Sequence, residues 1–150
     1  MRTLANSVNL AEIIERLKSM KEEDRGLWGV MSAPEMICHL RGAFRVAMGE
    51  LPSAPIRTAI PPEVIKSNAL WTPVPWRQNF ETVPVLKRGT PTMQVGSFEM
   101  DRADVLAELD RFCQPEQVRV DHSFFGPMST VDWMRWGYLH TDHHLRQFGR

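Results

Sequence analysis

Residues 133–147 read WMRWGYLHTDHHLRQ, and this segment carries the strongest structural signal in the chain. His140 and His144 stand four residues apart, so on a helix they lie on one face, one turn apart. Two imidazoles in that arrangement can bind one metal ion, because imidazole is a ligand for zinc, nickel, iron and copper alike. Two ligands hold a metal weakly, so a third is expected from elsewhere, and outside this segment the chain has only His39 and His122.

On a helical wheel the two histidines share a broad face with aromatic residues. The residues within roughly 60° of His140 are Trp133, Trp136, Gly137, His143, His144 and Gln147. His143 points to the edge of this face, which makes it the weaker candidate for a metal ligand. The opposite side carries charged residues and is expected to face water.

The same helix has a second apolar stripe, made of Val131, Met134, Tyr138 and Leu145. A helix with two apolar stripes packs on two sides, so this stripe needs a cover. Either another helix of the same chain or a second copy of the protein can supply that cover. A homodimer is therefore one expectation.

Helical periodicity of apolar residues predicts an all-α protein with four main helices. Ser32 and Glu35 have the spacing of a capping box, and Ser129 and Asp132 form a variant of it. Pro34 suits the first turn of the helix after Ser32. The predicted helices span about residues 9–24, 34–49, 102–114 and 130–148, with Ser7 or Asn9 expected to cap the first and Asp101 the third.

A long irregular segment, residues 51–98, separates the second and third helices and holds most of the chain's eleven prolines. Proline breaks regular structure, although a short helix near residues 62–68 is compatible with the pattern. A connection of this length usually carries function or packs over something. Trp71, Trp76 and Phe80 favour packing. The segment is expected to be a crossover that covers the metal site and sets the substrate.

His39 is the first candidate for the third metal ligand, since it lies on the apolar face of the second helix. The alternative for His39 is a core histidine with a satisfied hydrogen bond. Arg41 falls on the opposite face. Glu35 is either only a capping residue, or it is a fourth metal ligand or a base near the metal. His122, in the loop before the last helix, either fixes that loop or serves the site.

Composition excludes several classes of protein. The chain has 150 residues, which suits one domain spanning residues 1–150, and its 18 basic and 18 acidic side chains cancel. Without a basic field, nucleic-acid binding is not expected. Two cysteines do not make a disulfide framework. No signal peptide and no long apolar run is recognisable, so a cytoplasmic protein that does not bind membranes is expected.

Several motifs resemble the DinB-like superfamily of small metal-binding helical bundles. They are Trp28, the Met-x-x-His-Leu pattern ending at Leu40, the His-Ser-Phe-Phe-Gly-Pro-Met-Ser run that begins at His122, and residues 136–147. The run from His122 is similar to one subgroup whose function is not assigned. The resemblance implies a four-helix bundle of up-up-down-down topology, often dimeric, in which His39, His140 and His144 hold a divalent metal.

The resemblance also implies an activity. Understood members of the superfamily transfer groups to low-molecular-weight thiols, and others are isomerases. The leading hypothesis is therefore a metal-dependent enzyme, a thiol S-transferase or hydrolase, that uses zinc or nickel, with iron or manganese as alternatives. Glu35, His122 and His143 are the candidates for moving a proton, and Trp71, Trp76, Trp133 and Trp136 for the pocket wall. The alternatives are a non-catalytic metal-binding or stress-associated protein, and a bundle whose histidines are only polar core.

Overall fold

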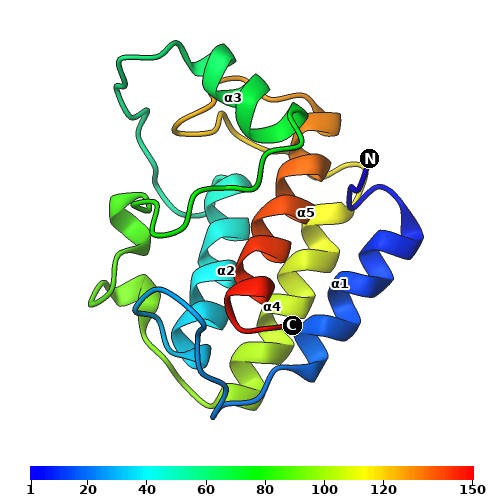
Figure 1. The fold of residues 1–150 in the computed structure, drawn as a ribbon, viewed down its shortest axis with the longest axis vertical. Coiled ribbons are helices and arrows are strands. Elements are labelled where there is room, and N and C mark those ends of the chain that lie inside the picture. Colours follow the sequence, from blue (N-terminus) through cyan, green and yellow to red (C-terminus); the bar gives the residue numbers. More distant parts are fainter.

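The computed structural model describes residues 1–150, and its named elements are all helices, which confirms the expected all-α bundle. Four helices form the bundle: α1 (Ser7–Ser19), α2 (Ala33–Ala47), α4 (Phe98–Cys113) and α5 (Thr130–Gln147). The segment between α2 and α4 carries the helix α3 (Pro62–Trp71) and two 3₁₀ turns, η1 (Pro84–Leu86) and η2 (Pro91–Met93). Figure 1 shows this crossover lying over one end and one side of the bundle.

The helix directions differ from the expected up-up-down-down order. Arg41 near the middle of α2 pairs with Asp101 near the start of α4, and the α2 carbonyl of Ala47 accepts from Val120 just after α4, so these helices run parallel. Figure 1 shows α1 and α5 running in the opposite direction. The order along the chain is therefore up-down-down-up. The physical reason is that the long crossover returns the chain to the starting end of α2, whereas the shorter connections join antiparallel neighbours.

Local capping explains where the helices begin. Ser32 and Glu35 form the expected capping box at α2, and Ser129 and Asp132 form one at α5. The cap of α1 is Asn6, whose side chain accepts from the Val8 and Asn9 amides, so the expectation of Ser7 or Asn9 was wrong. The first helix also ends at Ser19, before the predicted boundary.

The third bundle helix begins at Phe98 rather than near residue 102, so Asp101 is not a cap but lies inside α4. Its buried carboxylate accepts from Arg41 Nη1 at 2.7 Å and from the Gly96 amide at 2.8 Å. Cys38 Sγ lies 3.6 Å from the same carboxylate. This Asp101 cluster binds α2, α4 and the end of the crossover together. Arg41, expected on an outer face, is therefore part of the helix interface.

The core lies between the four bundle helices, and it includes the second apolar stripe of α5. Met134, Tyr138 and Leu145 are buried, whereas Val131 is exposed. Helix α1 and the amino-terminal Leu4 pack over this stripe, and a Cβ atom on Gly137 would come within 2.5 Å of Leu4 Cδ1. The same chain thus covers the second apolar stripe. The homodimer stays a prediction, but this stripe no longer argues for it.

The crossover is packed rather than extended. The short helix expected near residues 62–68 is present as α3, which packs against α5. The turns η1 and η2 pack on α2, where Leu86 and Met93 are buried. No helix combines the length and the apolar character needed to cross a membrane.

Candidate metal centre

Three histidines from two helices meet inside the bundle. His39 comes from the middle of α2, and His140 and His144 come from successive turns of α5, which runs antiparallel to α2. Each can offer a ring nitrogen, and these atoms all lie within 4.8 Å of one another. His39 Nε2 and His140 Nε2 are 3.3 Å apart. The structure therefore places three imidazoles around one point, an arrangement that can hold a metal ion.

Burial keeps these histidines neutral. Loss of solvation lowers the pKa of His39 to about 4, with the nearby His143 as a smaller cause. The pKa values of His140 and His144 lie well below the ordinary value, again because of burial first and then because neighbouring imidazoles would repel a second charge. Metal ions bind neutral imidazole, so the triad is held in its ligand form.

One nitrogen–nitrogen distance in the triad matches that expected around a bound metal ion. Two nitrogens bound at about 2.0–2.1 Å to a tetrahedral ion stand about 3.3–3.4 Å apart. The His39–His140 distance of 3.3 Å agrees with this value. The buried Nδ1 of His140 has no hydrogen-bond partner, which is unusual for a purely structural core histidine. These residues therefore fit a divalent transition metal.

Aromatic rings and one amide hold the triad in place. Trp136 stacks on His140 with ring centroids 4.9 Å apart and planes at 15°. Trp76, from the crossover, lies with its ring 6.1 Å from His140 and also 6.1 Å from His143. His144 Nδ1 is 3.0 Å from Gln147 Oε1. The triad is thus enclosed by side chains of both the bundle and the crossover.

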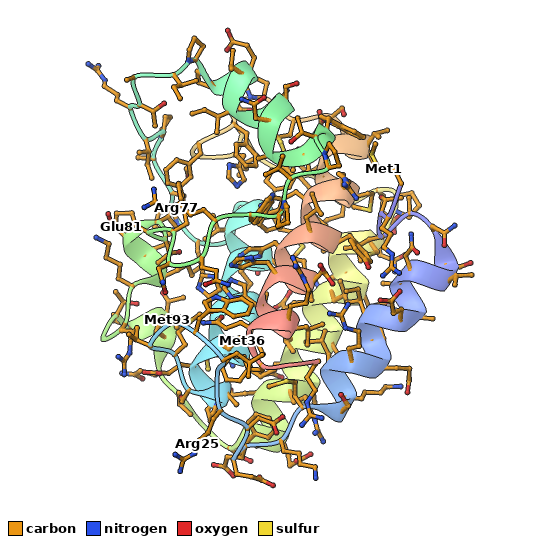
Figure 2. All side chains as sticks on the ribbon, viewed as in Figure 1. Met1, Arg25, Met36, Arg77, Glu81 and Met93 are labelled. Atoms are coloured by element: carbon orange, nitrogen blue, oxygen red, sulfur yellow. The ribbon has the colours of Figure 1, made fainter.

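The triad opens into a cavity of about 990 Å³. This volume is at the upper end of the range for small-molecule sites. The bundle, the loop before α2, the crossover and the loop before α5 all contribute to its wall, which is mainly apolar. The aromatic lining residues are Trp28, Trp76, Phe80, Phe124, Phe125, Trp133 and Trp136. Figure 2 shows Arg77 and Glu81, two further lining residues, on the crossover at the side of the bundle.

The two crossover tryptophans behave differently. Trp76 lines the cavity, and its indole Nε1 donates to the Ala69 carbonyl at 2.7 Å. Trp71 does not line the cavity, and its Nε1 donates to Asp132 Oδ1 at 3.0 Å on the outer side of α5. The expectation that Trp71 walls the pocket was wrong, because that residue docks the end of α3 on the α5 amino terminus.

Glu35 is engaged outside the cavity. Its Oε2 accepts from the Ser32 amide at 2.8 Å and its Oε1 from Arg88 Nε at 2.8 Å. Burial alone would raise the pKa of this carboxyl, but the hydrogen bonds from Ser32 and Arg88 outweigh it and hold the pKa below its ordinary value. The geometry thus uses Glu35 as a cap of α2 and an anchor for Arg88.

The other two candidates for moving a proton both line the cavity. His122 Nδ1 lies 3.2 Å from the Phe124 amide and 3.3 Å from the Phe125 amide, both of which donate to it, and burial lowers its pKa to about 4. His143 is half-buried, edge-on to Trp28, and its pKa is lowered by burial and then by Arg146. No hydrogen bond occupies the His143 ring.

Residues 6–150 match the family described as "Protein of unknown function (DUF1569)". The chain belongs to this family. The DUF1569 match includes all four bundle helices and every residue of the triad and the cavity wall. No curated protein and no solved structure matches the chain.

Proposed function

We propose that this DUF1569 protein is a DinB-like, metal-dependent enzyme that joins a thiol to an apolar small molecule. The observation that carries the proposal is a triad of neutral histidines at the inner end of a large, mostly apolar cavity. The motif resemblance to thiol S-transferases supports the reaction class. A surface metal site with a storage or stress role would not need a cavity of about 990 Å³ beside it.

His39, His140 and His144 would hold the ion. A divalent transition metal bound there would lower the pKa of a thiol, or of water, so that a nucleophile exists at neutral pH. Zinc and nickel are the first candidates, because imidazole suits both and geometry does not separate them.

The chain's own residues provide the proton path. His143 is neutral, has no hydrogen-bond partner and faces the cavity, so its ring nitrogen accepts the thiol proton. The thiol sulfur then forms a bond to an electrophilic carbon of the second substrate, and the bond from that carbon to its leaving group breaks. The leaving group departs with the electron pair and receives the proton from His143. His122, whose Nδ1 is occupied by two backbone amides, shapes the wall beside it.

The wall indicates which second substrate fits. Indole and phenyl rings dominate it, and they bind apolar or aromatic molecules and exclude water. Several apolar residues that line the cavity are also exposed at its rim: Val30, Ile60, Val74 and Phe80. An apolar electrophile can therefore enter along an apolar surface, while the crossover closes over the triad.

Metal analysis and turnover test this function. We expect purified protein to contain about one divalent metal ion per chain, and His140→Ala to lose it because two ligands remain. Arg146→Ala, six residues further along and on the exposed side of α5, is the matched control and should keep the metal. Thiols would then be tested against an apolar electrophile such as 1-chloro-2,4-dinitrobenzene. Full metal retention in both His39→Ala and His140→Ala would end the proposal. Metal binding without turnover by any thiol would favour the non-catalytic alternative.

The crossover as a lid has its own test. Trp76→Ala removes a ring from the cavity wall and should weaken binding of an apolar ligand by about 10-fold or more while sparing the metal, since burial of a large side chain contributes roughly 1.5–3 kcal/mol. Trp71→Ala removes an equal volume outside the cavity and should leave binding unchanged. Tryptophan fluorescence titration measures both. Equal ligand affinity in the two variants would show that the crossover is only structural.

A further inference from the structure

We propose that Gln147 is a positioning residue that fixes the tautomer of His144 and ties the loop before α2 to the triad. This inference rests on the proposed metal function. The resemblance to the DinB-like superfamily gives Gln147 no role. Gln147 is buried at the end of α5, one turn after His144. Its side-chain amide lies between His144 and the backbone of Trp28.

The direction of the hydrogen bonds follows from one carbonyl. Gln147 Nε2 lies 2.9 Å from the Trp28 carbonyl oxygen. A carbonyl oxygen can only accept a hydrogen bond, so the NH₂ group of the Gln147 side chain must point toward Trp28 and donate to it. The amide oxygen then faces His144 Nδ1 at 3.0 Å. An amide oxygen also only accepts, so neutral His144 must carry its proton on Nδ1. The lone pair is left on Nε2, the nitrogen that is free to bind a metal.

The other two histidines lack this kind of control. Nδ1 of His140 is buried without a partner, and its ring is held by stacking on Trp136. The structure gives His39 no hydrogen bond other than the contact to His140. His144 is therefore the one member of the triad whose tautomer is set by a neighbouring side chain.

The same residue also docks the loop between α1 and α2. The Leu27 amide donates to the Gln147 carbonyl at 2.7 Å, and the side-chain amide holds the carbonyl of Trp28. Gly29 has φ +79°, and a Cβ atom there would come within 2.4 Å of Gln147 Nε2. Glycine is thus required for the close approach. Because Trp28 and Gly29 line the cavity, Gln147 connects the cavity wall to the metal ligand.

The test separates the two tasks of Gln147 by substitution. Gln147→Met keeps the side-chain length but has neither the donor nor the acceptor, and Gln147→Glu keeps an acceptor for His144 but cannot donate to Trp28 when ionised. Arg146→Ala, at the exposed neighbouring residue, is the matched control. Long-range proton–nitrogen correlation NMR on metal-free protein reports the tautomer of each histidine, and competition with a chromophoric chelator reports Zn²⁺ affinity.

We expect His144 of the metal-free parent protein to be protonated on Nδ1, and Gln147→Met to mix the tautomers and weaken Zn²⁺ binding by about 10- to 100-fold. Gln147→Glu should keep the Nδ1–H tautomer while the Trp28 amide and indole signals shift. An Nε2–H tautomer in the parent, or an unchanged tautomer and Zn²⁺ affinity in Gln147→Met, would overturn the inference. If the parent binds no divalent transition metal at all, the proposed function fails, but the tautomer measurement still decides the role of Gln147.

Discussion

Two polar clusters are buried against α2, and they differ in how fully their atoms are bonded. Against α4, both oxygens of Asp101 accept hydrogen bonds, from Arg41 and from the Gly96 amide. Against α5, three neutral imidazoles face one another with one nitrogen–nitrogen contact at hydrogen-bond distance, and His140 Nδ1 has no partner. A bonded cluster stabilises a fold, whereas an incompletely bonded one costs free energy unless a ligand completes it. The difference separates a cluster that stabilises the fold from one that is left open to a ligand.

Acidification should produce the largest effect, because it acts on the histidine cluster as a whole. The pKa values of the buried histidines, about 4 for His39 and for His122, lie below the ordinary 6.5 in the folded protein. Their contribution to stability is therefore full above pH 6.5 and is lost as the pH falls from there toward 4. For each histidine that stays neutral in the folded protein, the free energy of unfolding falls by about 1.4 kcal/mol per pH unit over this range.

Urea denaturation of metal-free protein between pH 7.5 and 5 measures this slope. His122→Phe keeps the triad, and the pH dependence of its unfolding free energy should be smaller by the contribution of one histidine. A urea midpoint that stays constant from pH 7 to pH 5 would contradict the burial of neutral imidazoles.

Breaking the Asp101 cluster should have the next largest effect. Asp101→Ala leaves the Arg41 guanidinium without its main partner, and removing one member of a buried pair costs about 3–5 kcal/mol. The lower end of this range is expected because the Arg41 side chain is still 19% exposed to solvent. For a chain of this size the melting temperature should fall by roughly 10 °C.

Asp104→Ala is the matched control for Asp101→Ala. The Asp104 carboxylate also reaches Arg41, at 3.4 Å, but its side chain is 61% exposed. Exposed ion pairs contribute about 0–1 kcal/mol, so this variant should melt close to the parent. Equal melting temperatures for the two variants would show that the Asp101 cluster is not the structural one.

Replacing a triad histidine by an apolar residue should raise the stability of the metal-free protein, whereas breaking the Asp101 cluster lowers it. His140→Leu removes a buried ring nitrogen that has no partner, and such a group costs about 1–3 kcal/mol. Part of this gain is offset by imperfect packing against Trp136, so the metal-free variant should be as stable as the parent or up to about 1 kcal/mol more stable. Chemical denaturation of both metal-free proteins tests this. A loss as large as that of Asp101→Ala would mean that the histidines are structural.

The smallest effect concerns the thiols. Burial, and then the Asp101 charge, raises the pKa of Cys38 to about 11, and burial raises that of Cys113 to about 11. The thiolate fraction is then about 100-fold below that of an unfolded cysteine, so alkylation by iodoacetamide at pH 8 should be slower by at least that factor. Mass spectrometry of native and denatured protein measures the ratio. Rapid labelling of Cys38 in the native protein would show that the Asp101 cluster opens.

The two clusters were not equally predictable from the sequence. His140 and His144 are one turn apart on one helix, and local periodicity places such residues together. The Asp101 cluster depends on two helices running parallel, and neither periodicity nor capping patterns contain that information. Asp101 therefore looked like a helix cap, and Arg41 like a surface residue. Trp71 and Trp76 lie five residues apart in the crossover, and only the turn after α3 directs one ring to the cavity and the other away from it.

The crossover that makes α2 and α4 parallel also affects how the protein folds. His39 and His140 are 101 residues apart in the chain, and Arg41 and Asp101 are 60 apart. Contacts between distant residues form late, because the entropy of closing the intervening loop must be lost before any contact compensates for it. We expect this bundle to fold more slowly than an up-down bundle of equal length. If the triad binds a metal ion as proposed, its site forms only when α5 closes on α2, so the ion would favour the completed fold over every partly folded one.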